Sequence, residues 1–280
     1  MGWREDSHLV LRYFLNLQTM KQTTINSSPL RAGRFTSSEI VNLMSKDKTG
    51  TEFGKPAITY IAQTNKERRL GRSLTADVTA HSLSWGKSVE SHVFNLLGLE
   101  YSLTSQETDL HPLYGDFWAG SKDGEKEDTI IDIKCPMTLD SFCGIVDPLY
   151  EGYDGREAIM MSMNGYTGKD GMFHPAHKSI EDYYWQLVSN AIINNKKYAE
   201  LIVYVPYKSE LNMIREHVHN LDLDEQWRYK WIYDADDDQL PHILDKGYYK
   251  NLNVIRFEVP EMDKIRLTEA VLKASELLIK

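Results

Sequence analysis

The sequence predicts a mixed α/β fold in which helices flank a central sheet. Two observations predict it. Short apolar runs of strand length alternate with amphipathic segments of helical spacing, and turn residues stand at their junctions. The leading order is helix, three strands, helix and strand, which is typical of a mixed α/β core with helices on the faces of the sheet.

Helices are predicted in the first hundred residues. A short helical pattern covers residues 9–17, and hydroxyl cap candidates precede apolar residues at helical spacing over 36–44. Residues 84–97 form an amphipathic pattern that has Val89 and Val93 on its apolar side. We expect this last segment to pack one face against the sheet.

Three strands are predicted next, over residues 100–104, 115–121 and 128–134. The turn-like sequence 122–125, Lys-Asp-Gly-Glu, joins the last two. We therefore expect 115–121 and 128–134 to form a hairpin and to lie side by side.

The remainder divides into an insert, a helix–strand pair and an extension. Residues 137–179 are rich in Gly, Asp, Tyr and Met and are predicted to be an irregular insert. A helix over 180–194 and a strand over 198–205 follow. The C-terminal extension, 207–280, is predicted to contain a helix over 209–221, a strand over 253–259 and a helix over 261–279.

Composition indicates one domain over residues 1–280, because a chain of this length buries one sizeable core with little left for a second. The longest apolar runs have strand length, so no membrane span is expected. Cys135 and Cys143 are the only cysteines, which excludes a four-thiolate zinc or iron–sulfur site and favours the cytoplasm.

The net charge of −9 argues against a uniformly basic nucleic-acid binder. Basic residues nevertheless cluster in the N-terminal third, between Arg31 and Arg72. Affinity for phosphate depends on where cations cluster rather than on their total. The charge pattern thus fits both a protein that grips DNA in one groove and an ordinary acidic enzyme.

The sequence Asp132-Ile-Lys134 carries the clearest chemical signal. Side chains alternate along a strand, so Asp132 and Lys134 share one face. Asp116, on the expected neighbouring strand, would meet them there. Two carboxylates suit Mg²⁺ or Mn²⁺, and the lysine would orient the water that attacks a phosphodiester. The alternative is an exposed strand with alternating charges.

Three further segments offer candidates. Glu90, on the 84–97 helix, would add a carboxylate to the same metals, or lie on a solvated helix face. Gln186 would bind water or phosphate, or remain on the surface. Arg31, near Ser38 at a helix start, would bind a terminal phosphate. The alternative is a plain helix cap with a solvated arginine beside it.

These segments occur in one order along roughly residues 28–206: Arg31-x-Gly-x-x-Thr36-x-Ser38-Glu39, Trp85-Gly-Lys-x-x-Glu90, Gly115-Asp116, Asp132-Ile-Lys134-Cys-Pro136 and Gln186. Together they resemble the phage lambda exonuclease, or YqaJ-like viral recombinase, family of PD-(D/E)XK nucleases. The resemblance implies a restriction-endonuclease-like core, a central mixed sheet flanked by helices.

The resemblance also implies a role for each residue. The metal ligands are Glu90, Asp116, Asp132 and the carbonyl of Ile133; the catalytic lysine and motif glutamine are Lys134 and Gln186; Arg31 and Ser38 hold the 5′-phosphate; Leu83 is the wedge that parts the strands. Asp132 stands where a glutamate is frequent, and Gly115 stands where the class name has proline.

The function implied is a Mg²⁺-dependent exonuclease, with Mn²⁺ as a substitute, that degrades one strand of linear duplex DNA 5′ to 3′. Family members form a ring-shaped trimer and work beside a single-strand annealing protein in recombination, and the gene would belong to a phage, a prophage or a bacterial host. Two alternatives remain: a structure- or site-specific endonuclease of repair or restriction, and a DNA-end-binding protein with a disabled site.

Overall fold

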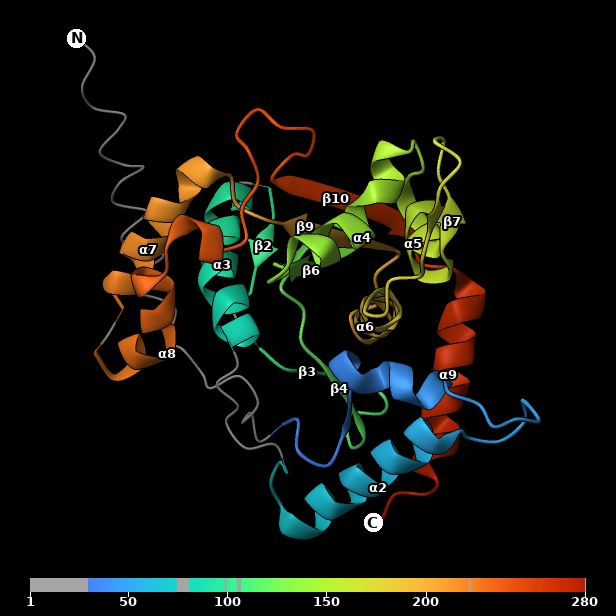
Figure 1. Cartoon of the computed structure of the whole chain (residues 1–280). Helices are drawn as coiled ribbons and strands as arrows, with labels where there is room; N and C mark the ends of the chain where they lie inside the picture. The colour runs from blue at the N-terminus through green and yellow to red at the C-terminus, as the bar shows by residue number, and fades with distance from the viewer. Residues whose placement is uncertain (1–29, 75–80, 99, 105–106, 222, 280) are drawn as a thin grey trace.

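The chain is described by a computed structural model over residues 30–74, 81–98, 100–104, 107–221 and 223–279. The helix expected over 9–17 lies outside these residues. At the centre stands a five-stranded sheet (Figure 1). Its order is β10 (Leu252–Glu258), β9 (Tyr198–Tyr204), β6 (Thr129–Lys134), β5 (Gly124–Lys126) and β2 (Ser102–Leu103).

The central sheet is mixed. Strand β6 runs parallel to β9, with Asp132 opposite Leu201, and the other neighbours in the sheet are antiparallel. A parallel pair needs a long crossover, and residues 135–197 supply it. The predicted α/β class, a mixed sheet flanked by helices, is confirmed.

Side-chain alternation along β6 divides the core into two parts. Ile131 and Ile133 pack with residues of α3 (His81–Leu97), α7 (Leu211–His219) and α8 (Leu223–Asp234) on one face. Ile130 points to the opposite face, into the larger cluster. The helices of that cluster are α2 (Lys55–Leu70), α4 (Leu139–Tyr150), α5 (Gly155–Asn164), α6 (Ile180–Ile193) and α9 (Glu261–Ser275). Figure 1 shows the α3, α7 and α8 group across the sheet from α6 and α9.

A second, three-stranded sheet has the order β1 (Phe35–Thr36), β4 (Trp118–Gly120) and β3 (Asp109–Leu110). A buried polar network joins it to the helical layer. The Trp118 indole N–H donates to the Ser189 hydroxyl at 2.9 Å, and that hydroxyl lies 2.8 Å from Ser37 Oγ. Ser37 begins the 3₁₀ helix η1 (Ser37–Met44), so the network fixes η1 against α6.

The hairpin predicted between 115–121 and 128–134 is wrong. Within 115–121 only β4 is strand, and it pairs with β1 and β3 in the small sheet. The antiparallel partner of β6 is β5, which overlaps the end of the segment expected to be the turn. Local sequence predicts that a strand is present but not which strand pairs with it. Strand β4 pairs with β1, which is distant from it in the sequence.

The insert differs from expectation, whereas the extension contains the predicted helix, strand and helix as α7, β10 and α9. Residues 137–179 were predicted to be irregular, yet they contain α4, α5 and the strand pair β7 (Tyr166–Thr167) and β8 (Phe173–His174). The extension is integral to the core, since β10 is an edge strand on β9 and α9 packs beside α6. None of the helices described is both long and apolar enough to cross a membrane.

We expect Gly120→Ala to destabilise the fold by about 1–3 kcal/mol through overpacking. A Cβ at this position would stand 2.3 Å from both Asn190 Oδ1 and Ser37 Oγ, which are buried. Urea unfolding measures the loss. Gly86→Ala is the control, because nothing lies within 4 Å of its added methyl, and it should keep or raise stability. Equal effects from both substitutions would contradict the steric argument.

Candidate active site

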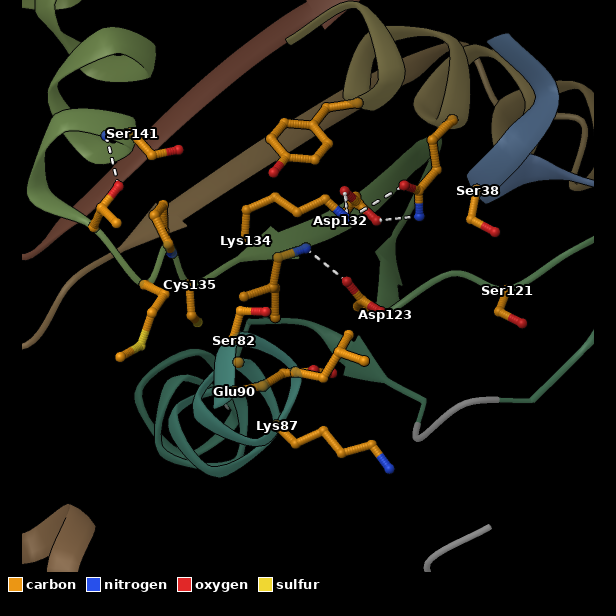
Figure 2. A pocket seen from close by; sticks show the side chains of 18 of the residues that line it. Ser38, Ser82, Lys87, Glu90, Ser121, Asp123, Asp132, Lys134, Cys135 and Ser141 are labelled. Carbon is orange, nitrogen blue, oxygen red and sulfur yellow. Dashed lines mark hydrogen bonds and ion pairs between the residues drawn. The ribbon is translucent and has the colours of Figure 1, made fainter. Parts of the chain in front are cut away.

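A cavity of about 600 Å³ lies between α3, the end of β6 and α6. Titratable and polar groups from several elements line it (Figure 2). They include Glu90 and Lys87 on α3, Asp123 before β5, Asp132 and Lys134 on β6, and Tyr183 and Gln186 on α6. The structure thus brings together Glu90, Asp132, Lys134 and Gln186, as the sequence predicts.

The cavity forms where β5 leaves β6. Pairing between the two strands begins at Gly124 and Ile131, so the last residues of β6 have no strand partner on that side. Asp123 takes that place with its side chain, because Oδ2 accepts the N–H of Ile133 at 2.6 Å. This bond fixes the Asp123 carboxylate beside the face that carries Asp132 and Lys134.

Lys134 is held by a short polar network. Its ammonium lies 2.7 Å from Asp132 Oδ2 and donates to Gln186 Oε1 at 3.2 Å. The Gln186 amide in turn donates to Asp132 Oδ1 at 2.8 Å. Asp132 is completely buried, so these donors offset much of the cost of burying its charge.

The carboxylates of the cavity are harder to ionise than usual. Burial raises the pKa of Asp123 to about 7, and the nearby Asp132 adds to the rise. Burial raises the pKa of Asp132 as well, and burial together with Asp123 raises the pKa of Glu90 well above its usual value. Burial alone would lower the pKa of Lys134, but Asp132 and Asp123 outweigh it and raise this pKa, so the ammonium stays charged.

Stability without metal should fall as pH rises towards 7. Between the usual pKa of an aspartate, about 4, and the raised pKa of Asp123, the native state holds a proton that the unfolded chain has lost. Raising pH through this window therefore removes stability. Urea unfolding in EDTA at several pH values measures the slope, and Asp123→Asn, which cannot ionise, should flatten it. An unchanged slope in that variant would contradict the assignment.

The structure does not bring Asp116 into this cavity, so that prediction needs correction. Asp116 is exposed in the turn before β4, and its carbonyl accepts a hydrogen bond from Arg68 at 2.7 Å. Because β4 belongs to the small sheet, its strand partners are not those of β6. Asp123 occupies the place predicted for Asp116. The sequence places Asp123 in the turn-like segment 122–125, which does not distinguish it from Asp116 as a ligand.

The donor set fits a hard divalent cation. Three carboxylates, Glu90, Asp123 and Asp132, line one cavity, and burial, the main cause of their raised pKa values, makes three negative charges there costly without a cation. Within the described part of the chain, no three acidic, imidazole or thiolate groups already stand at metal-holding positions. Lys134 and Gln186 engage both Asp132 oxygens, so a cation would have to share or displace these partners.

Arg31 and Ser38 meet beside the cavity, as predicted. One Arg31 nitrogen donates to Ser38 Oγ at 2.9 Å and another to Ser121 Oγ at 3.3 Å. Both residues also line a second cavity of about 340 Å³. Glu39 and Glu67 line this second cavity too, so the cations there are accompanied by acids.

The turn that carries Arg31 is clamped at Gly33. Its N–H donates to Glu67 Oε2 at 2.9 Å, and its carbonyl accepts from Arg68 Nε at 2.9 Å. Gly33 has φ +71°, and a Cβ would stand 2.7 Å from Arg68 Cγ, so only glycine fits. Helix α2 thereby sets the direction of Arg31.

Two other predicted residues lie at the cavity, and sequence reasoning missed two more. Ile133 lines it and directs its N–H to Asp123, and Leu83 lines it with its side chain partly exposed. Their expected roles, a carbonyl ligand and a wedge, remain predictions. Besides Asp123, the sequence did not single out Tyr183, whose position one helical turn before Gln186 was the available signal.

The fold is shared with solved exonucleases. The alkaline exonuclease LHK-Exo from Laribacter hongkongensis is 16% identical, with a TM-score of 0.50 over 88% of this chain and 89% of that chain. The structure of LHK-Exo in complex with dAMP is 15% identical, with a TM-score of 0.51 over 89% of this chain and 90% of that chain. A phage-related exonuclease from Haemophilus somnus 129PT is 13% identical, with a TM-score of 0.53 over 89% of this chain and 94% of that chain.

Sequence comparison adds no relative. No protein-family model matches the chain, and no curated protein matches it. The likeness to the exonucleases therefore lies in the fold, and at that level it confirms the predicted restriction-endonuclease-like core.

Proposed function

We propose that this protein is a Mg²⁺-dependent DNA exonuclease that degrades one strand of a linear duplex from its 5′ end. One observation carries the proposal. The acidic cavity with Lys134 and Gln186 adjoins the Arg31–Ser38 pair, on a fold that solved exonucleases share. A cleavage site beside an anchor for a terminal phosphate is the arrangement that an exonuclease requires.

Glu90, Asp123 and Asp132 would hold Mg²⁺, with Mn²⁺ as a substitute, and the carbonyl of Ile133 is a further expected ligand. Oxygen donors of this kind suit both ions. When bound, such cations, two in our proposal, supply Lewis-acid stabilisation of the charge that develops on the phosphate. Asp123 replaces Asp116 in this set.

Lys134 and Gln186 act on the water and the phosphate. The Lys134 ammonium keeps its proton, so it serves as a donor that orients the attacking water and offsets negative charge. Gln186 hydrogen-bonds both Lys134 and Asp132 through its amide and so links the two side chains. The helix that carries it is deeply buried, which limits motion of the pair.

Arg31 and Ser38 would anchor the 5′-phosphate, and Leu83 would part the strands. The guanidinium offers a charged, forked donor, and the Ser38 hydroxyl adds a further polar contact. The ring trimer, the annealing partner and the role in recombination rest on the family resemblance alone, and they stay predictions.

Linear duplex with 5′-phosphate ends should be degraded in Mg²⁺, and a covalently closed circle should remain intact. Removing the 5′-phosphate, or replacing Arg31 with alanine, should slow digestion by about 10- to 100-fold, because a charge-assisted contact is lost. Gel assays with strand-specific labels report rate and direction.

Cleavage of the circle would favour the endonuclease alternative. End binding without Mg²⁺-dependent cleavage would favour the end-binding alternative. Equal rates on phosphorylated and hydroxyl ends would count against the anchor while leaving a nuclease in place.

A further inference from the structure

The Lys134 ammonium has a third neighbour besides Asp132 and Gln186. It lies 4.9 Å from the centre of the Tyr183 ring, within the range of a cation–π contact. Tyr183 lines the same cavity and is half-buried. The ring is therefore an uncharged third contact of the ammonium.

Tyr183 stands on a rigid support. It lies one turn before Gln186, so both side chains leave the same face of α6. The residues on either side of it in the helix, Ile180, Tyr184 and Leu187, are buried in the core. The helix backbone that carries the ring is therefore held firmly beside the lysine.

A neutral partner matters because Asp132 has two tasks. Its carboxylate pairs with Lys134, yet it is also one of the oxygens that would hold the divalent cation. A cation drawing on that carboxylate weakens its hold on the ammonium, which then also faces a like charge. Attraction by the ring face and by Gln186 does not depend on the charge of Asp132.

We propose that Tyr183 is the positioning residue for Lys134, and that the face of its ring keeps the ammonium in the cavity during cleavage. This inference rests on the proposed nuclease function. The contact depends on the negative electrostatic potential of the ring face and not on the hydroxyl of Tyr183. Removing the hydroxyl should therefore preserve cleavage, whereas withdrawing electron density from the ring should slow it.

The test is a series of phenylalanines at position 183 bearing none, one, two or three fluorines, with Tyr183→Leu as the variant that lacks a ring. Fluorine removes electron density from the ring face at nearly constant shape. Single-turnover cleavage should be retained with phenylalanine and fall stepwise with fluorination, by about 5- to 30-fold at three fluorines. KM for DNA should stay constant.

Two controls separate positioning from other effects. Mn²⁺ affinity, measured by EPR without DNA, should be unchanged along the series and lost in Asp132→Asn. The same fluorinated residues at Tyr198, whose ring contacts Lys197 and Arg256 outside the cavity, should leave cleavage unchanged.

A flat series with an active wild type would overturn the role of Tyr183 and leave the nuclease proposal standing. A series that changes KM or Mn²⁺ affinity instead of the cleavage rate would overturn that role too. A wild-type chain that cleaves no DNA would overturn both.

Discussion

Asp123→Asn is expected to lower the rate of DNA cleavage by at least about 100-fold, whereas Asp116→Asn should change it by no more than about twofold. Asp123 faces the cavity with Asp132, and its loss removes an anionic oxygen donor where we propose the cation binds. Asp116 is exposed outside the cavity, where its backbone carbonyl accepts a hydrogen bond from Arg68. Gel assays at saturating Mg²⁺ measure both rates.

The two variants are well matched. Each exchanges one carboxylate oxygen for an amide nitrogen, and the amide oxygen of Asp123→Asn can still accept the N–H of Ile133. Circular dichroism should therefore show both folded, and Mn²⁺ affinity should fall only for Asp123→Asn. An inactive Asp116→Asn beside an active Asp123→Asn would restore the ligand set predicted from sequence and refute the one derived from the structure.

Lys134→Met is expected to slow cleavage by about 10²- to 10⁴-fold, the range found when a positioned proton donor or acceptor is removed. Methionine fills a similar volume but cannot donate to water or offset the charge of Asp132. The raised pKa of Lys134 means that the wild-type ammonium is fully charged at neutral pH. The pH profile below pH 10 should therefore show no increase in activity that comes from deprotonation of this lysine. Single-turnover cleavage across pH measures both effects.

Lys196→Met is the matched control for this lysine. Its side chain has 19% relative exposure against 20% for Lys134, and it pairs with Glu125 at 3.3 Å outside the cavity. It should retain cleavage. Strong residual cleavage in Lys134→Met, with correct folding, would remove the lysine from the mechanism.

Part of the site could be predicted from sequence because it depends on local geometry. Strand periodicity alone places Asp132 and Lys134 on one face of β6, since any strand over 129–134 does so. Helical periodicity buries Val89 and Val93 on α3 and leaves Glu90 beside them, at the margin of the cavity. The order of these motifs carried the family resemblance and, with it, the expected core.

The insert shows where composition misleads. Helix α4 contains Gly144 and Pro148, and α5 begins at Gly155, so the segment has the composition of a loop. Packing outweighs that composition. Phe142, Ile145 and Ile159 are completely buried in the large core cluster. A Cβ at Gly144 would stand 2.7 Å from His177, so this glycine permits close approach rather than a turn.

The sequence by itself determined that Asp132 and Lys134 share a strand face, and the resemblance carried by the order of its motifs added Glu90 and Gln186 to the same site. Only the tertiary structure decided the third carboxylate. Asp116 and Asp123 each stand beside a short strand, and local propensity does not choose between them. The choice follows from strand pairing: β4 joins β1 in the small sheet, while β5 joins β6 and carries Asp123 to it. Pairing is selected by the burial of distant side chains, a long-range property that local patterns do not contain.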